Sequence, residues 1–76
     1  MLLIGDSIKQ YYENGNIELE GLLISDKWEG LLIIYYEDGK VNRKLNYSNG
    51  ELNGLEEVWF QNGQKFDINW KNDEKN

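Results

Sequence analysis

The sequence contains no cysteine, no proline and no histidine. It therefore has no disulfide and none of the imidazoles that most often bind metals, so neither kind of cross-link can hold a small fold together. A chain of 76 residues that folds alone removes only about 60 to 65% of its unfolded surface from water. Backbone pairing and aromatic packing have to stabilise a thin core, and we expect no metal and no cofactor.

Positive charge is also scarce, since 14 Asp and Glu against 8 Lys and Arg give a net charge of −6. This balance argues against direct binding to nucleic acid, because each phosphate contact needs a cation. It suits a basic protein partner, and nucleic-acid-processing enzymes are a common basic class. The alternative is that the charge only keeps the protein soluble.

Long apolar runs are absent as well. Residues 1–4 are apolar, but Gly5 and Asp6 end the run at once, so it is far too short for a secretory or membrane-spanning segment. The lack of cysteine agrees with a reducing compartment. We expect a cytoplasmic protein that does not bind membranes.

What the sequence does contain is a repeat. Three pentapeptides that begin with two aromatic residues and end in Asn-Gly or Asp-Gly start at Tyr11, Tyr35 and Trp59, 24 residues apart. A period of this length indicates a supersecondary unit copied in tandem. Asn-Gly and Asp-Gly are strong signals for tight β-hairpin turns, which need backbone angles that few other residues adopt at low cost. We therefore predict an all-β fold, a single antiparallel meander sheet of three tandem β-hairpin repeats.

The whole chain, residues 1–76, is predicted to form one domain. Glycine recurs too often to leave a window for a helix, and residues 1–4 are expected to add a partial strand. The expected repeats are near 7–29, 30–53 and 54–71, followed by a frayed tail at 72–76. The expected strands are near 7–13, 16–24, 30–37, 40–48, 54–61 and 64–71.

Counting outward from two-residue turns predicts which side chains share a face of the sheet. The expected pairs are Lys9 with Glu20, Tyr11 with Glu18, Tyr12 with Ile17, and Glu37 with Lys40. One face is expected to carry Ile8, Tyr12, Ile17, Leu19, Leu32, Ile34, Tyr36, Val41 and Leu45.

The third hairpin conflicts with this count. Its last strand alternates as Phe66, Ile68 and Trp70, whereas the period places the inward residues one position earlier. A slip of one residue exchanges the two faces of a strand. We predict a longer loop or a bulge near Gly63, which brings these three side chains beside Val58; the alternative is a degenerate terminal repeat.

Two aromatic rows follow, with Tyr12, Tyr36 and Phe60 on one face and Tyr11, Tyr35 and Trp59 on the other. One row has to join the core, and an exposed aromatic row commonly marks an interaction surface. Both assignments are open on the sequence alone; we assign the second row to the outside because polar residues surround it. The predicted partner-binding residues are Tyr11, Tyr35, Trp59, Glu18, Glu20 and Asp67.

The three pentapeptides, together with Tyr47-Ser48-Asn49-Gly50-Glu51-Leu52-Asn53-Gly54, resemble the MORN-repeat variant family over nearly the whole chain. The connection after the first repeat departs from the family pattern, and so does the connection after the third, where Asp73 stands in place of glycine. The resemblance implies a repetitive antiparallel sheet and a role in protein contacts. Similar bacterial members are often labelled YwqK-type antitoxins, and small acidic proteins of this kind can equally be phage-encoded blockers of a bacterial defence enzyme.

Chemistry at a reaction centre is not indicated. A general acid or base needs a pocket, and Glu56 and Glu57 are neighbours in a strand, so they point to opposite faces and are expected to be solvated. The cluster Lys40, Arg43 and Lys44 favours nucleic acid only weakly, because no second cluster supports it. The sequence therefore predicts a non-enzymatic module that inhibits a basic enzyme, such as a nuclease or toxin, by occlusion. Self-association through open sheet edges, as a homodimer for example, is the alternative.

Overall fold

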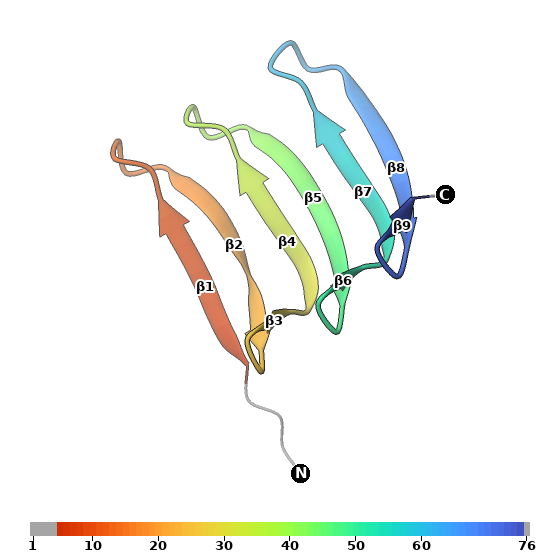
Figure 1. The fold of residues 1–76 in the computed structure, drawn as a ribbon. Helices are drawn as coiled ribbons and strands as arrows, with labels where there is room; N and C mark the ends of the chain where they lie inside the picture. The colour runs from red at the N-terminus through yellow and green to blue at the C-terminus, as the bar shows by residue number, and fades with distance from the viewer. Residues whose placement is uncertain (1–4, 76) are drawn as a thin grey trace.

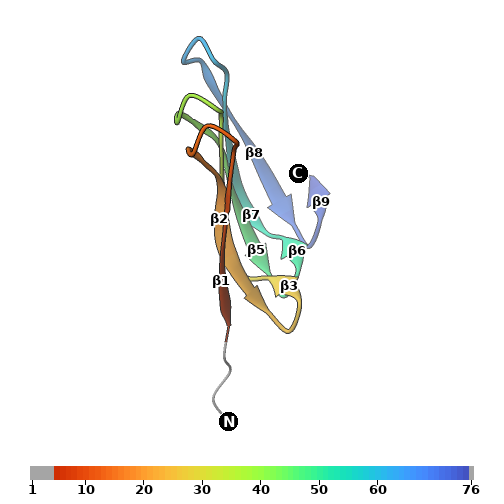
Figure 2. The ribbon, with the colours of Figure 1, turned by 90° about the vertical axis from the view of Figure 1, so that its left-hand side faces the viewer.

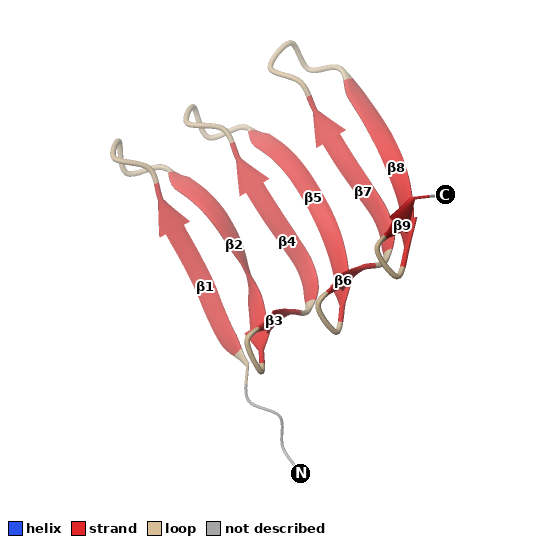
Figure 3. Ribbon diagram, in the orientation of Figure 1, coloured by secondary structure: helices blue, strands red, loops and turns tan. Residues whose placement is uncertain are grey.

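The computed structural model describes residues 5–75, and no helix occurs among them (Figure 3). Long antiparallel strands follow one another across a single open sheet (Figure 1). The predicted meander of three hairpins is therefore confirmed. The long strands are β1 (Asp6–Tyr11), β2 (Ile17–Ile24), β4 (Gly30–Tyr35), β5 (Val41–Ser48), β7 (Gly54–Trp59) and β8 (Lys65–Lys71). The short strands β3 (Lys27–Trp28), β6 (Glu51–Leu52) and β9 (Glu74–Lys75) pair with the ends of β2, β5 and β8.

Each hairpin tip is a three-residue loop, one residue longer than predicted for the first two hairpins. In the first tip the N–H of Tyr12 donates to the carbonyl of Asn16 at 2.8 Å, and the N–H of Gly15 donates to the carbonyl of Tyr12 at 3.0 Å. Gly15 has a φ of 91°, a left-handed backbone that favours glycine. The side chain of Asn14 accepts the N–H of Asn16 at 2.9 Å. The same bonds recur in the other two tips, which explains why Asn or Asp precedes each glycine.

A β-bulge follows the tip in the first two hairpins. In the first, Tyr11 pairs with Ile17 but Gln10 pairs with Leu19, so Glu18 is an extra residue in β2. Asn42 is the corresponding extra residue of β5. The longer loop shifts the pairing by one residue, and the bulge shifts it back by one residue. Beyond the bulge, the residues therefore pair as predicted.

The predicted pairs beyond the bulge are confirmed, because Lys9 faces Glu20 and Leu32 faces Leu45. The pairs predicted between loop and bulge are wrong by one residue. The structure has Tyr11 with Ile17, Tyr12 with Asn16, Tyr35 with Val41 and Tyr36 with Lys40, in place of Tyr11 with Glu18, Tyr12 with Ile17 and Glu37 with Lys40.

The third hairpin has no bulge. Val58 pairs with Phe66, whereas its counterpart Ile34 pairs with Arg43, so Phe66 occupies the place of a residue 23 positions earlier. One residue has been lost relative to the first two repeats, and the alternation of the last strand follows from that loss. The predicted longer loop near Gly63 is confirmed, because the third tip has three residues and no bulge compensates for it. Phe66 therefore lies opposite Val58, as predicted.

Two-residue turns connect the long strands to the short ones. Both central residues of each turn have positive φ, for example 51° at Ser25 and 64° at Asp26, as the right-handed twist of a tight hairpin requires. After the third hairpin the turn leads into β9, where Glu74 pairs with Lys71. The tail predicted to be frayed is therefore paired with β8 as far as position 75. The partial strand predicted at 1–4 lies outside the described residues, as does position 76.

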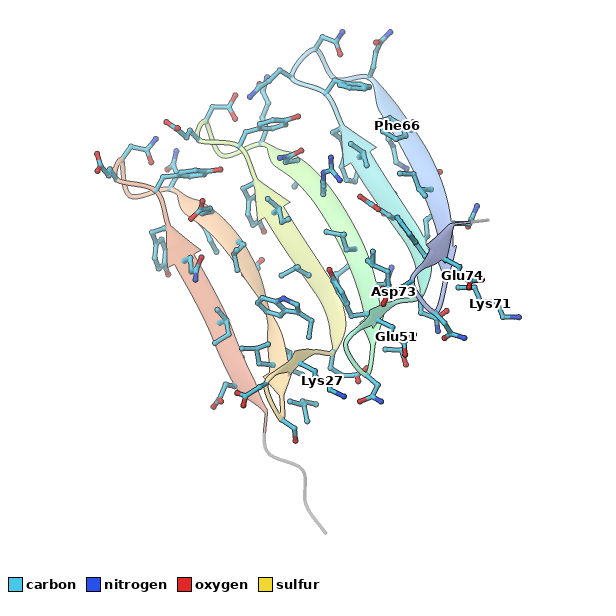
Figure 4. The ribbon with its side chains drawn as sticks, viewed as in Figure 1. Lys27, Glu51, Phe66, Lys71, Asp73 and Glu74 are labelled. Atoms are coloured by element: carbon cyan, nitrogen blue, oxygen red, sulfur yellow. The ribbon has the colours of Figure 1, made fainter. Side chains whose placement is uncertain are left out.

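The connections stack on one another at one end of the sheet. The N–H of Gly50 donates to the carbonyl of Trp28 at 3.0 Å, and the N–H of Asp73 donates to the carbonyl of Leu52 at 2.8 Å. Lys27, Glu51 and Glu74 hold equivalent places in β3, β6 and β9 along this end (Figure 4). Backbone hydrogen bonds between connections therefore continue the sheet contacts from one repeat to the next.

The core lies on one face of the sheet, which we call the core face. Leu32, Leu45 and Val58 are its buried apolar side chains. The indole of Trp28 covers the same face, and glycine at position 21 leaves room for it, because a Cβ there would lie 2.9 Å from the indole and 2.7 Å from Leu32. The strands β3, β6 and β9 are set to one side of the long strands (Figure 2). The fold measures 43 × 33 × 13 Å, a single layer.

Candidate protein-binding face

Three aromatic side chains occupy one place in successive hairpins and lie on the side opposite the core face. These are Tyr11 in β1, Tyr35 in β4 and Trp59 in β7, and we call their side of the sheet the aromatic face. Tyr11 is 59% exposed, whereas the other two are partly covered. Ile17 and Val41 pair with Tyr11 and Tyr35 and so belong to this face. Their predicted place on the core face is wrong, because the three-residue loops change the register there.

Tyr35 and Glu20 are joined on the aromatic face. The hydroxyl of Tyr35 donates to Oε1 of Glu20 at 2.7 Å. This hydrogen bond, with burial and the negative charge of Glu20, raises the pKa of Tyr35 above its ordinary value of 10.0. The phenol therefore stays neutral over the physiological range and fixes the carboxylate beside it.

Trp59 lies between two ammonium groups. The Nζ atoms of Lys44 and Lys65 are 5.8 and 5.4 Å from its ring centroid, within the range of cation–π attraction. Lys65 also bridges to Glu57 at 2.6 Å and to Asp67 at 3.4 Å. The hydrogen bond to Glu57 is the main cause that raises the pKa of Lys65. This end of the aromatic face is thus an indole framed by paired charges rather than by free acids.

The six predicted partner-binding residues fall into separate groups. Tyr35 joins Glu20 by a hydrogen bond, and Lys65 connects Asp67 to Trp59. Tyr11 stands at the exposed end of the row. Glu18 is the extra residue of the bulge in β2 and has no cross-strand partner. Their role in binding stays a prediction.

The second aromatic row joins one hairpin to the next. The hydroxyl of Tyr12 donates to the carbonyl of Tyr35 at 2.6 Å, and the hydroxyl of Tyr36 donates to the carbonyl of Trp59 at 2.6 Å. Phe60 holds the same place in the third hairpin and has no hydroxyl. The tyrosine is therefore present where a following hairpin supplies an acceptor among the described residues.

Sequence reasoning missed a buried carboxylate. Glu56 is only 2% exposed, although the sequence indicated a solvated charge. Its Oε2 accepts a hydrogen bond from Nη1 of Arg43 at 2.9 Å, and its Oε1 accepts one from Nε1 of Trp70 at 2.7 Å. The signal was present in the alternation of β7, which places Glu56 on the same face as Val58.

The predicted cationic cluster is divided between the two faces. Arg43 pairs with Glu56 on the core face, whereas Lys44 approaches the ring of Trp59 on the aromatic face. Adjacent residues of a strand point to opposite sides, so the three cations do not form one patch. Lys40 and Lys44 line one hollow between the second and third tips, and Arg43 lies on the other face.

Open hollows lie between the hairpin tips, and their charges differ. The hollow between the first and second tips, of about 490 Å³, carries two carboxylates, and the hollow between the second and third, of about 380 Å³, carries two lysines. The first is lined by Tyr12, Glu13, Asn14 and Glu37. The second is lined by Lys40, Val41, Lys44, Trp59, Phe60 and Gly63.

Two further classes of site are not found over residues 5–75. No group of three or more histidine, cysteine, aspartate or glutamate side chains is arranged to hold a metal ion. In the same part of the chain, no helix has the length and apolar character needed to cross a membrane. The chemistry of the described surface is that of aromatic rings, amides and paired charges.

Comparison with known proteins identifies the same repeat that the sequence and the fold show. No curated protein and no solved structure matches the chain. A family model described as MORN repeat variant matches residues 8–23 and 28–49, which together make up half of the 76 residues. The matched segments cover the two bulged hairpins and end before the third, which has lost the bulge residue. This chain belongs to the family of MORN repeat variants.

Proposed function

We propose that this chain is a protein-binding module that inhibits a partner enzyme by covering part of its surface. The observation that carries the proposal is the single-layer sheet, only 13 Å thick, in which an aromatic row lies on the face opposite the buried side chains. A layer of this kind offers area for contact. Exposed aromatic side chains are the residues that most often dominate the binding energy of protein interfaces.

The proposed partner is a basic enzyme such as a nuclease or toxin. The net charge of −6 favours approach of a basic surface. Tyr11 and Glu18 lie together at the first hairpin, and Glu20 lies beside Tyr35. The module would act as an antitoxin-like protein, or as a phage-encoded inhibitor of a bacterial defence nuclease, and would block the partner by steric and electrostatic occlusion.

A non-catalytic role is part of the proposal. Glu56 is the buried carboxylate of the described residues, and both of its oxygens are engaged, one by Arg43 and one by Trp70. A general acid or base needs a group that can exchange a proton with a substrate in a pocket. The contacts of Glu56 instead join β5, β7 and β8, which is a structural use of the charge.

The test is inhibition of a purified partner. The tagged chain is used to capture proteins from its native host, and the recovered enzyme is then assayed with and without added chain. We expect one dominant basic enzyme, inhibited at an equimolar ratio. The affinity should fall between about 50 and 500 mM salt, as the Debye length shrinks from roughly 14 to 4 Å. An enzyme that binds but keeps its full activity would contradict inhibition by occlusion.

Tyr11→Ala and Gln10→Ala form a matched pair for locating the contact. Both residues are exposed neighbours in β1, and they point to opposite faces. We expect Tyr11→Ala to weaken binding by about 2 kcal/mol and Gln10→Ala to leave the affinity nearly unchanged. Equal effects would place the contact elsewhere than on the aromatic face.

Self-association is a second candidate function. The outer edge of β1 and most of the outer edge of β8 have no strand paired to them among the described residues. Open edges tend to pair with another chain.

A further inference from the structure

We propose that the outer edge of β8 binds the outer edge of β1 in a second copy of this chain, so that the copies join head to tail. This contact goes beyond the proposed inhibition of a partner, and it is testable on the purified chain alone. The template for it is the contact that the chain already makes between its own hairpins.

Within the chain, each hairpin joins the next through a short backbone contact and a few side chains at the tips. Between the second and third hairpins the paired residues are Arg43 with Val58 and Lys44 with Glu57. Between the first and second, the side-chain amide of Asn14 also donates to the carbonyl of Glu37 at 2.9 Å, as does that of Asn16 at 2.8 Å. Each internal junction also contains a tyrosine hydroxyl that donates to the next hairpin and a backbone hydrogen bond between connections. The first junction has Leu19 paired with Ile34 and Glu20 paired with Ile33.

The outer edge of β8 corresponds to the edge of β5 that pairs with the next hairpin. Because the third hairpin lacks the bulge, Phe66 and Asp67 stand at the places of Arg43 and Lys44. The short strand β9 pairs only with Trp70 and Lys71 and leaves the rest of this edge open.

The third tip also retains the two amides that the second tip has lost. Asn62 and Gln64 stand at the places of Asn14 and Asn16. Oδ1 of Asn62 accepts the backbone N–H of Gln64 at 3.0 Å, and Nδ2 of Asn62 lies 3.4 Å from Oε1 of Gln64. They are thus free to donate to a backbone carbonyl, as their counterparts in the first hairpin do.

An apolar pair lies on the same edge. The rings of Phe60 and Phe66 have centroids 5.5 Å apart, and they are 49% and 42% exposed. Phe66 lies on β8 at the open side of the sheet (Figure 4). A neighbouring strand here would cover part of the exposed ring surface, which favours association.

The outer edge of β1 supplies the complementary side. Lys9 and Gln10 stand at the places of Glu57 and Val58, so the junction geometry pairs Asp67 with Lys9 of the second copy. These are opposite charges, as Lys44 and Glu57 are at the junction within the chain. The carbonyl of Glu13, at the place of Glu37, then faces the amides of the third tip. A single register of β8 against β1 thus brings Asp67 to Lys9 of the second copy and also brings the carbonyl of Glu13 to the amides of the third tip.

The junction is weaker than the internal ones because Phe60 lacks the hydroxyl that Tyr12 and Tyr36 use. It joins two different surfaces, and copies added in this way form an open row instead of a closed pair. Association therefore depends on protein concentration and, through the charge pair, on salt.

Sedimentation velocity over a range of concentrations at about 50 mM salt tests the contact. We expect reversible association of the unaltered chain, loss of association in Asp67→Lys and in Lys9→Asp, and recovery in the double variant. Circular dichroism and urea unfolding of each variant check that it is folded. Lys9 and Asp67 lie on opposite edges of one sheet and cannot meet within a copy, so recovery reports a contact between copies. A chain that stays monomeric, or single variants that associate as the unaltered chain does, would overturn the proposal.

A gain of function gives a second test. Phe60→Tyr restores the missing hydroxyl opposite the carbonyl of Tyr11 in the second copy, and we expect the association constant to rise roughly fivefold. An unchanged constant contradicts the assigned register.

The absence of native cysteine permits a check of direction. When Lys9→Cys and Asp67→Cys chains are mixed under oxidising conditions, we expect disulfide-linked pairs that contain one of each variant. Pairs of two Lys9→Cys chains would show that two β1 edges meet each other, which overturns the head-to-tail arrangement.

Discussion

Oε1 of Glu56 lies 2.7 Å from Nε1 of Trp70. This bond crosses from β7 to β8 on the core face, while the other carboxylate oxygen holds Arg43 of β5. A carboxylate excluded from water is costly unless its oxygens are hydrogen-bonded, and here both are. The second and third hairpins therefore meet around a polar group, next to the buried side chains of Leu45 and Val58.

Glu56→Ala is expected to destabilise the fold by about 2 to 3 kcal/mol. The change leaves the indole N–H of Trp70 without its partner, removes the charge beside Arg43 and opens a space in the core. Equilibrium unfolding in urea, followed by tryptophan fluorescence, measures the loss. Glu57→Ala is the matched control, because its carboxylate bridges to Lys65 on the aromatic face and is more exposed. A smaller loss is expected there, and equal losses would show that burial of Glu56 does not set its importance.

Tyr36→Phe is expected to cost about 1 kcal/mol. The substitution keeps the ring and removes the hydroxyl that donates to the carbonyl of Trp59 at 2.6 Å. Hydrogen exchange of the backbone amides of β7 and β8 should also quicken, because the third hairpin is released at its tip.

Phe60→Tyr is the control for Tyr36→Phe, because it tests the same hydroxyl at the equivalent position of the third hairpin. It adds the same hydroxyl where the described residues provide no following hairpin, so at concentrations where the chain is monomeric we expect almost no change in stability. If both substitutions shift the free energy of unfolding equally, the hydroxyl acts through something other than the contact between hairpins.

Deletions of Glu18 and Glu20 are expected to differ sharply. Glu18 is the extra residue of the bulge, and its deletion gives the first hairpin the unbulged form that the third already has. The cost should be about 1 kcal/mol. Deletion of Glu20 also removes the bulge, but it places Glu18 on the core face and Leu19 on the aromatic face, while Gly21 and the residues after it keep their register. The cost should be larger, about 3 kcal/mol. Circular dichroism should show that both variants fold, and the urea midpoint should fall further for the second.

The bulge also explains how far the sequence could predict the fold. The 24-residue period identified all three hairpins, because the signals at Asn14, Asp38 and Asn62 and the glycines that follow them are local. The period could not show that loop and bulge each add a residue, since their effects on register cancel at Lys9 and Glu20. Only the third hairpin, where one of the two is missing, exposed the mismatch.

The aromatic row of the candidate site could be predicted from the sequence, but the contacts of its charged side chains could not. Alternation along a strand was enough to place Tyr35 and Trp59 on one face. The pairing of Glu20 with a phenol, and of Asp67 with Lys65, depends on distances across strands that the sequence does not contain. Glu56 was misjudged for the same reason, because burial of a charge follows from partners on neighbouring strands.

The hydrogen bond between Tyr35 and Glu20 predicts a loss of stability in alkali. The pKa of Tyr35 is raised in the folded chain, first by this bond and then by burial and by the charge of Glu20. In the unfolded chain the phenol loses its proton near its ordinary value of 10.0, whereas in the folded chain it is retained to higher pH. The folded state then binds more protons, so the free energy of unfolding falls as pH rises above that value. The contribution is fully present below it.

Urea unfolding between about pH 8 and pH 11 measures this fall. The pKa values of Tyr12 and Tyr47 are also raised, chiefly by burial, so they add to the slope. Tyr35→Phe should therefore make the decline above pH 10 shallower without abolishing it, and Glu20→Gln should do the same because it removes the carboxylate while keeping an acceptor. Tyr11→Phe removes a phenol that makes no hydrogen bond to a carboxylate among residues 5–75 and serves as the control. A slope that Tyr35→Phe leaves unaltered would mean that the bond to Glu20 does not hold the proton, and that the alkaline loss arises from the other two phenols.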